Sequence, residues 1–148
     1  MKGIQARIWL RGRFRKGWLA WEKGKLIEVR EGSTPKKFAS RIDNYGEARI
    51  LPGFVDTLVH GFAGIGAATH SAIDLDRMAR GLARAGVTSA LAGFYPLSLA
   101  RLRGASKRWT TCKKLRGVRT RFTGWHVEGL FINPEMAGAL PKEGLLTP

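Results

Sequence analysis

Two side chains with metal-binding chemistry, His60 and Glu128, each stand at the end of an apolar run and directly before a glycine. Imidazole nitrogens and carboxylate oxygens are common ligands of divalent metal ions. In a parallel barrel, catalytic groups collect at the C-terminal ends of the strands. Two such strands would direct both side chains at one ion, so we predict that His60 and Glu128 are metal ligands.

The chain has the length and composition of an ordinary globular domain, because 148 residues with 44% hydrophobic content can form a core. Its net charge of +15 is high for this length. The densest basic stretch, Arg101–Arg121, holds nine Lys and Arg and no acidic residue. Such a charge permits binding to nucleic acid, an anionic membrane or a phosphorylated substrate, and it is equally compatible with solvated helix faces.

Cysteine content and hydropathy indicate the cellular compartment in which the protein is expected. Cys112 is the only cysteine, which excludes an intramolecular disulfide and a cysteine-based zinc site. No apolar run reaches the roughly 20 residues of a membrane span. Arg7, Arg11 and Arg13 interrupt the region where a signal peptide needs its apolar stretch. We therefore expect a cytoplasmic protein without a membrane partner.

The N-terminal region, residues 1–47, has the pattern of a small β layer. Apolar and polar residues alternate over residues 4–10, and two further short strands are predicted at 18–21 and 26–29. The four residues Glu22–Lys25 include a glycine and predict a hairpin connection between those two strands.

From residue 48 the pattern changes to strands that alternate with helices. Ser71 predicts the start of one helix and Gly86 its end. Ser98 and Gly117 bracket a second helix in the same way. This alternation is typical of βαβ units, so residues 48–148 are predicted to form an α/β domain with a parallel sheet. Its strands are predicted at residues 55–60, 87–94 and 122–131.

Four segments, taken in order, form a pattern that belongs to a known family. Pro52–Gly61 matches a Pro-Gly-Phe-(Ile/Val)-Asp-x-x-x-His-Gly strand, and Gly86–Ser89 stands where that family has Gly-Thr-Thr-Ser. Trp125–Phe131 matches its Leu-His-(Leu/Val)-Glu-Gly-Pro-Phe strand, and Asn133–Pro141 is similar to the loop that follows. The sequence thus resembles the amidohydrolase superfamily, and within it the N-acetylglucosamine-6-phosphate deacetylases.

The resemblance implies a fold and an activity. The family begins with a β-sandwich segment, to which residues 1–47 correspond, and continues into a metal-dependent (β/α)8 barrel. Residues 48–148 correspond to the N-terminal part of that barrel, so we expect an incomplete (β/α)8 barrel of about three βα units. The implied reaction is hydrolysis of the acetamide of a phosphorylated amino sugar, assisted by a divalent metal, zinc or iron.

The resemblance also assigns roles to residues. Glu128 matches the carboxylate that holds the principal metal, and His60 matches the second histidine of the family's His-x-His pair. Asp56 matches an aspartate of the same strand, for which we expect a structural role. The first position of the His-x-His pair is Leu58, which cannot donate a lone pair, and three further departures are nearby: Leu130, Ala137 and Leu140.

The family's remaining metal histidines and its catalytic aspartate lie on later strands that have no counterpart here. We therefore assign no catalytic or substrate-binding residue, and we expect the chain to be a hydrolase fragment that is inactive alone, from a truncated, split or decayed gene. Its expected partner is a second copy of itself or a complementing subunit. Its expected substrate, once a second chain completes the barrel, is a phosphorylated amino sugar.

Two other interpretations remain open. The first-strand motif is shared widely, so the alternative within the superfamily is another amide or cyclic-amide hydrolase. A basic nucleic-acid-binding module would use Trp109 and Arg101–Arg121 for stacking and phosphate contacts, although Trp109 lies on the apolar stripe of its predicted helix. His126 shares one side of its strand with Glu128, and we expect it to pack or to orient a neighbouring group.

Overall fold

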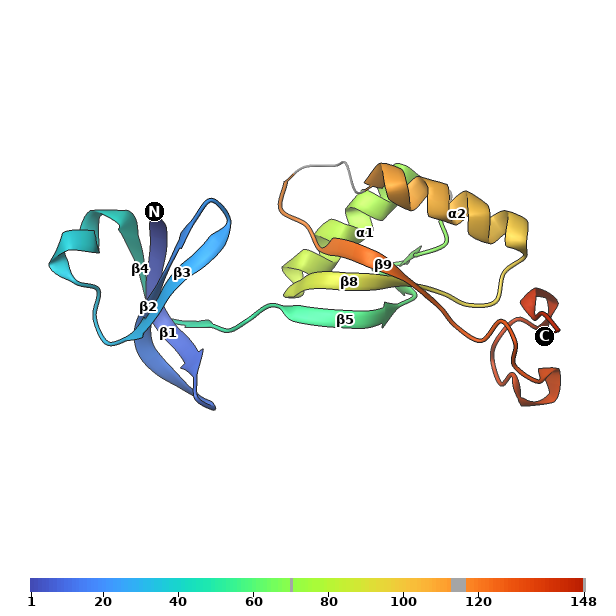
Figure 1. Cartoon of the computed structure of the whole chain (residues 1–148), viewed down its shortest axis with the longest axis horizontal. Coiled ribbons are helices and arrows are strands. Elements are labelled where there is room, and N and C mark those ends of the chain that lie inside the picture. Colours follow the sequence, from blue (N-terminus) through green and yellow to red (C-terminus); the bar gives the residue numbers. More distant parts are fainter. Residues whose placement is uncertain (70, 113–116, 148) are drawn as a thin grey trace. The chain divides into compact units, whose positions relative to one another are not determined.

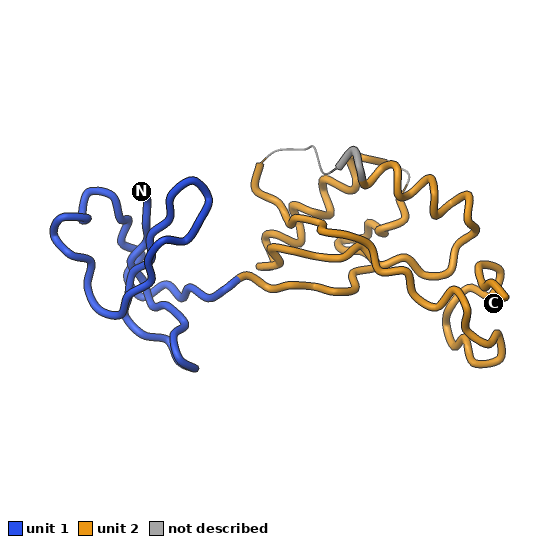
Figure 2. The backbone as a smooth tube through the Cα atoms, in the orientation of Figure 1, with its two compact units in different colours: residues 1–52 blue, residues 53–148 orange. Residues whose placement is uncertain are grey.

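The computed structural model describes residues 1–69, 71–112 and 117–147. The chain divides into two compact units, Met1–Pro52 and Gly53–Pro148 (Figure 2). The second unit combines parallel strands with helices, so the prediction of an α/β fold is confirmed. In the described part of the chain, no helix has the length and hydropathy to cross a bilayer.

The first unit contains four strands and one short 3-10 helix: β1 (Lys2–Leu10), β2 (Arg13–Glu22), β3 (Lys25–Glu31), η1 (Lys36–Arg41) and β4 (Ile42–Ile50). The strands form one sheet in the order β3-β2-β1-β4, with β4 parallel to β1 and the other pairs antiparallel. The turn at Lys23 and Gly24 has φ values of 48° and 76°, as a two-residue hairpin turn requires, and confirms the predicted hairpin.

The second unit contains the elements that carry the candidate site: β5 (Phe54–Val59), β6 (Gly61–Phe62), β7 (Ile65–Gly66), α1 (Ala72–Arg84), β8 (Val87–Phe94), α2 (Leu99–Cys112), β9 (Arg121–Val127), η2 (Pro134–Met136) and η3 (Lys142–Gly144). Strands β5, β8 and β9 form a parallel sheet with β8 in the centre. Strands β6 and β7 form a separate small hairpin between β5 and α1.

Both helices lie over the same face of the parallel sheet (Figure 1). The apolar residues of α1 pack there against the small side chains of β8, which let the helices approach closely. Trp109 of α2 is 1% exposed, its ring centre lies 4.1 Å from that of Phe122, and its Nε1–H donates to the Ala67 carbonyl oxygen at 3.1 Å. Other buried members of this core are Val59, Leu75, Met78, Ala79, Leu82, Ala90, Ala92, Phe94 and Ala105.

Capping explains where the helices begin and end. Ser71 Oγ accepts a hydrogen bond from the Asp74 amide at 3.2 Å, and Gly86 follows the helix with a φ of 89°, so both predicted boundaries of α1 are confirmed. Ser98 Oγ likewise accepts from the Arg101 amide at 3.4 Å at the start of α2. The helix is observed over Leu99–Cys112, and the part predicted beyond it, residues 113–116, lies outside the described residues together with its basic members Lys113, Lys114 and Arg116.

Candidate metal centre

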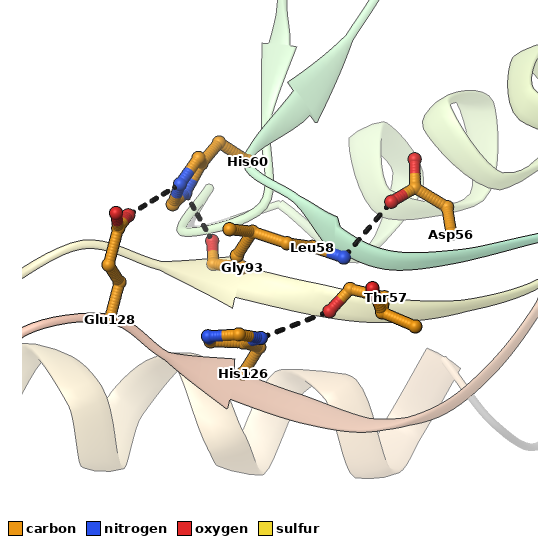
Figure 3. Close-up of polar contacts among 7 residues, drawn as sticks. All are labelled: Asp56, Thr57, Leu58, His60, Gly93, His126 and Glu128. Atoms are coloured by element: carbon orange, nitrogen blue, oxygen red, sulfur yellow. Dashed lines mark hydrogen bonds and ion pairs between the residues drawn. The ribbon is translucent and has the colours of Figure 1, made fainter.

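His60 and Glu128 meet at the carboxyl end of the parallel sheet (Figure 3). His60 directly follows β5 and Glu128 directly follows β9, so the pair comes from the two outer strands of the sheet. The Nε2 atom of His60 lies 2.9 Å from Oε2 of Glu128. The two side chains are 40% and 36% exposed, so both remain accessible to a solute.

Gly93 of β8 gives these side chains room to cross the central strand. A Cβ atom at this position would lie 2.8 Å from Leu58 Cδ1 and 3.0 Å from His60 Nδ1. Real Cβ atoms essentially never lie within 3.0 Å of another heavy atom, so the contact with Leu58 could not persist unchanged. A side chain at this position would therefore displace Leu58 and press on the imidazole of His60.

The hydrogen bonds of His60 determine which ring nitrogen is free. A carbonyl oxygen only accepts, so the 3.2 Å contact between His60 Nδ1 and the Gly93 oxygen requires Nδ1 to carry the hydrogen. In the neutral ring, Nε2 then holds a lone pair that faces the Glu128 carboxylate. Two electron-rich atoms at this distance need a proton or a metal cation to hold them together.

This donor arrangement fits a divalent metal. Histidines that bind metals commonly donate their second ring N–H to a backbone carbonyl or a carboxylate, which fixes the ring and its tautomer. His60 makes this bond to Gly93, and its lone pair converges with a Glu128 oxygen. The residues present therefore fit as two ligands of one ion.

The other two positions of β5 that the family resemblance singles out add no ligand to this pair. Leu58, at the first position of the His-x-His pattern, places a methyl group against Gly93. Asp56 Oδ1 accepts a hydrogen bond from the Leu58 amide at 3.0 Å (Figure 3). The Asp56 carboxylate is thus used within its own strand, where it supports the backbone.

Within the described residues, no group of three or more His, Cys, Asp and Glu side chains could hold a metal ion. Tetrahedral sites take three or four protein ligands, so two ligands make an incomplete set.

Immediately after Glu128, Gly129 has a φ of 59°, and a Cβ there would lie 2.3 Å from Ile132 Cδ1 and 3.1 Å from Leu140 Cδ1. Leu140 therefore packs beside the site as an apolar residue.

A hollow of about 540 Å³ opens next to His60, lined by Gly66, Ala68, Thr69, Ser71, Tyr95 and Arg101. Tyr95 connects the hollow to the contact of His60 and Glu128, because its ring centre lies 6.1 Å from that of His60. Sequence reasoning identified neither Tyr95 nor Gly93. Their shared signal is position, since Gly93 and Tyr95 stand at the C-terminal end of the central predicted strand, the edge where His60 and Glu128 were expected to meet.

Comparisons with known proteins support the family resemblance. No protein-family model matches the sequence. The chain is 28% identical over 130 residues to N-acetylglucosamine-6-phosphate deacetylase of Bacillus subtilis, an alignment covering 86% of this chain and 33% of that protein. It is 32% identical over 94 residues to N-acetylgalactosamine-6-phosphate deacetylase of Escherichia coli O157:H7, covering 64% and 25%. The chain thus spans a third or less of the length of these curated relatives.

Solved structures show the same fold relationship. N-acetyl-D-glucosamine-6-phosphate deacetylase of Mycobacterium smegmatis superposes with a TM-score of 0.73 at 21% identity, over 100% of this chain and 41% of that one. The Thermotoga maritima N-acetylglucosamine-6-phosphate deacetylase gives 0.68 at 22% identity, over 99% and 36%. The predicted resemblance to N-acetylglucosamine-6-phosphate deacetylases is therefore confirmed, and these enzymes are homologues of the chain over part of their length.

Proposed function

We propose that this chain forms the first part of a metal-dependent amidohydrolase barrel whose reaction is removal of the acetyl group from an N-acetylated amino-sugar phosphate. The observation that carries the proposal is the contact of His60 and Glu128 at the carboxyl end of a parallel sheet. Catalytic groups of (β/α) barrels collect at that end. The names of the curated relatives supply the substrate class.

His60 Nε2 and Glu128 Oε2 are the atoms that would hold the ion. Gly93 fixes the imidazole through its carbonyl oxygen, so the free lone pair keeps its direction toward Glu128. When bound, a divalent ion polarises the amide carbonyl and lowers the pKa of a coordinated water. The adjacent hollow, with Arg101 and the hydroxyl groups of Ser71 and Tyr95, offers a cation and hydrogen-bond donors for a phosphorylated sugar.

We further propose that the sheet is the incomplete barrel expected from the family resemblance. Within the described residues, the outer edges of β5 and β9 have no strand partner. Exposed apolar side chains lie on these two strands, among them Val55, Trp125 and Val127. Additional strands, from further residues or from a second polypeptide, would cover these edges and bring the remaining metal ligands. Without them, the chain should release no acetate at an enzymatic rate.

A chimera tests this function directly. Residues 1–148 are joined to the part of the Bacillus subtilis deacetylase that lies beyond the aligned region, and acetate release from N-acetylglucosamine 6-phosphate and N-acetylgalactosamine 6-phosphate is measured with zinc or iron. We expect turnover by the chimera and none by the chain alone. Glu128→Ala should lower turnover by more than about 100-fold, since even loss of a residue that merely supports a metal ligand costs 10- to 100-fold.

Zinc titration of the isolated chain covers the case in which the chimera fails to fold. His60→Ala and Glu128→Ala should each weaken zinc binding, whereas Glu47→Gln, an exposed carboxylate of the first unit, should not. Equal zinc binding by all four proteins would overturn the metal assignment. Turnover of a cyclic amide, with none of either sugar phosphate, would favour the alternative hydrolase of the superfamily.

A further inference from the structure

A second side-chain bond crosses the parallel sheet beside the metal pair. The Nδ1 atom of His126, on β9, lies 3.1 Å from the carbonyl oxygen of Thr57, on β5 (Figure 3). These strands are not neighbours, because β8 lies between them. His126 therefore spans the central strand, as the Glu128–His60 contact does.

The Thr57 oxygen is available because the pairing of β5 with β8 is irregular at this point. Asp56 pairs with Ala90, and Val59 pairs with Ala92. Between these two pairs β5 advances by three residues and β8 by two, so β5 contains one extra residue. An extra residue of this kind leaves backbone groups outside the regular ladder. Asp56 Oδ1 accepts from the Leu58 amide there, and His126 occupies the Thr57 oxygen, so both backbone groups have side-chain partners.

The extra residue decides which way His60 points. In a strand, a shift of one residue turns every following side chain to the opposite face. With the observed register, Val59 enters the core under the helices, and His60 emerges on the other face toward Glu128. The extra residue offsets an earlier irregularity, since β8 advances two residues between the pairs Phe54–Val87 and Val55–Ser89, so loss of the extra residue alone would exchange these two directions.

We propose that His126 is a positioning residue that holds the irregular segment of β5 and thereby keeps His60 directed at Glu128. This inference rests on the proposed metal site. Since the Thr57 carbonyl only accepts, His126 donates from Nδ1, and its Nε2 carries no hydrogen in the neutral ring. An Asn side chain has an N–H donor that can replace Nδ1, and a Leu side chain has none.

Zinc titrations of His126→Asn and His126→Leu test the inference. We expect the Leu variant to bind zinc about 10-fold more weakly, the lower end of what loss of a supporting residue costs, and the Asn variant to recover most of that loss. Thr123→Val is the matched control, because it removes a side-chain bond from β9 to the adjacent strand only, to the Ala90 oxygen at 3.4 Å. Zinc affinities of both His126 variants equal to that of the unmodified chain would overturn the proposal.

Nitrogen NMR of the unmodified chain gives a readout that depends on neither folding of the variants nor metal. The imidazole ¹⁵N shifts should show hydrogen on Nδ1 of His126 and none on Nε2 at a pH where the ring is neutral. Hydrogen on Nε2 would refute the bond to Thr57. If the His126 tautomer is as expected but His60→Ala leaves zinc binding unchanged, the metal site fails while the crossing bond stands.

Discussion

The Nδ1 atom of His60 lies 3.2 Å from the carbonyl oxygen of Gly93. Gly93 is also the residue over which the His60 side chain crosses the sheet. The same glycine thus supplies a hydrogen-bond acceptor from its backbone and open space from its missing side chain. Because Gly93 contributes in both ways, we expect a substitution at this position to disturb the candidate site.

Gly93→Ala should weaken zinc binding and lower stability. The added methyl group would press on Leu58 Cδ1 and His60 Nδ1, and overpacking of this kind typically costs 1–3 kcal/mol. Zinc titration and urea unfolding measure the two effects. The matched control is Gly124→Ala, where a Cβ would lie 3.2 Å from the flexible Leu91 Cδ2 and no atom of His60 or Glu128 is within 4 Å. Equal zinc affinities of the two variants would contradict the role of Gly93.

Trp109→Phe should destabilise the second unit by about 1–3 kcal/mol, because the Ala67 carbonyl oxygen loses its buried donor. The Ala67 amide donates to the His60 oxygen at 2.7 Å, so this indole also supports the segment that follows His60. Thermal unfolding followed by circular dichroism checks the loss. Trp9→Phe, at an exposed tryptophan of the first unit, should change stability by less than about 0.5 kcal/mol. Equal effects of the two substitutions would argue against this bond.

Asp76→Ala should be more damaging than loss of its neighbour Asp74. Asp76 forms ion pairs with Arg80 and with Arg119, whose side chain is 10% exposed and would be left without its counter-charge. Breaking a fully buried pair costs about 3–5 kcal/mol, and since the Asp76 side chain is 23% exposed we expect a smaller loss of about 1–3 kcal/mol. The Asp74–Arg77 pair is long, at 3.5 Å, and exposed, so Asp74→Asn should cost less than about 1 kcal/mol. Urea unfolding compares the variants, and a smaller loss for Asp76→Ala would show that the start of β9 does not depend on this contact.

Binding to a phosphate polyanion should weaken steeply as salt rises, since the net charge of +15 acts without specificity. Trp109 is buried, so a nucleic-acid base has no access to its ring. Trp109→Phe should therefore leave the affinity for single-stranded DNA unchanged in a folded protein. A loss approaching the 1–3 kcal/mol of a base stacked on an aromatic ring would support the nucleic-acid-binding interpretation instead.

The sequence predicted the alternation of strands and helices because each signal was local. Ser71 and Gly86 mark the ends of α1 through a cap and a positive φ, and both are determined by residues within one turn. The meeting of His60 and Glu128 followed from a general rule about parallel sheets. These features needed no knowledge of how the side chains pack.

The irregular pairing of β5 could not be predicted in the same way. A two-residue alternation assumes a regular ladder, whereas the step between Asp56 and Val59 depends on pairing with a strand some thirty residues away. The importance of Gly93 depends on two side chains from another strand. The role of His126 was expected only in general terms, because its acceptor exists only where the ladder is interrupted.

The two bonds that cross β8 have a mechanical consequence. Both outer strands are already hydrogen-bonded to β8, and each crossing bond adds a direct link between them. His126 contacts β5 at Thr57, and Glu128 contacts His60 directly after β5, so the two crossing bonds lie at different positions along the strand. Together they oppose sliding of β9 relative to β5, so moving one outer strand past the other requires breaking both contacts as well as the pairings with β8.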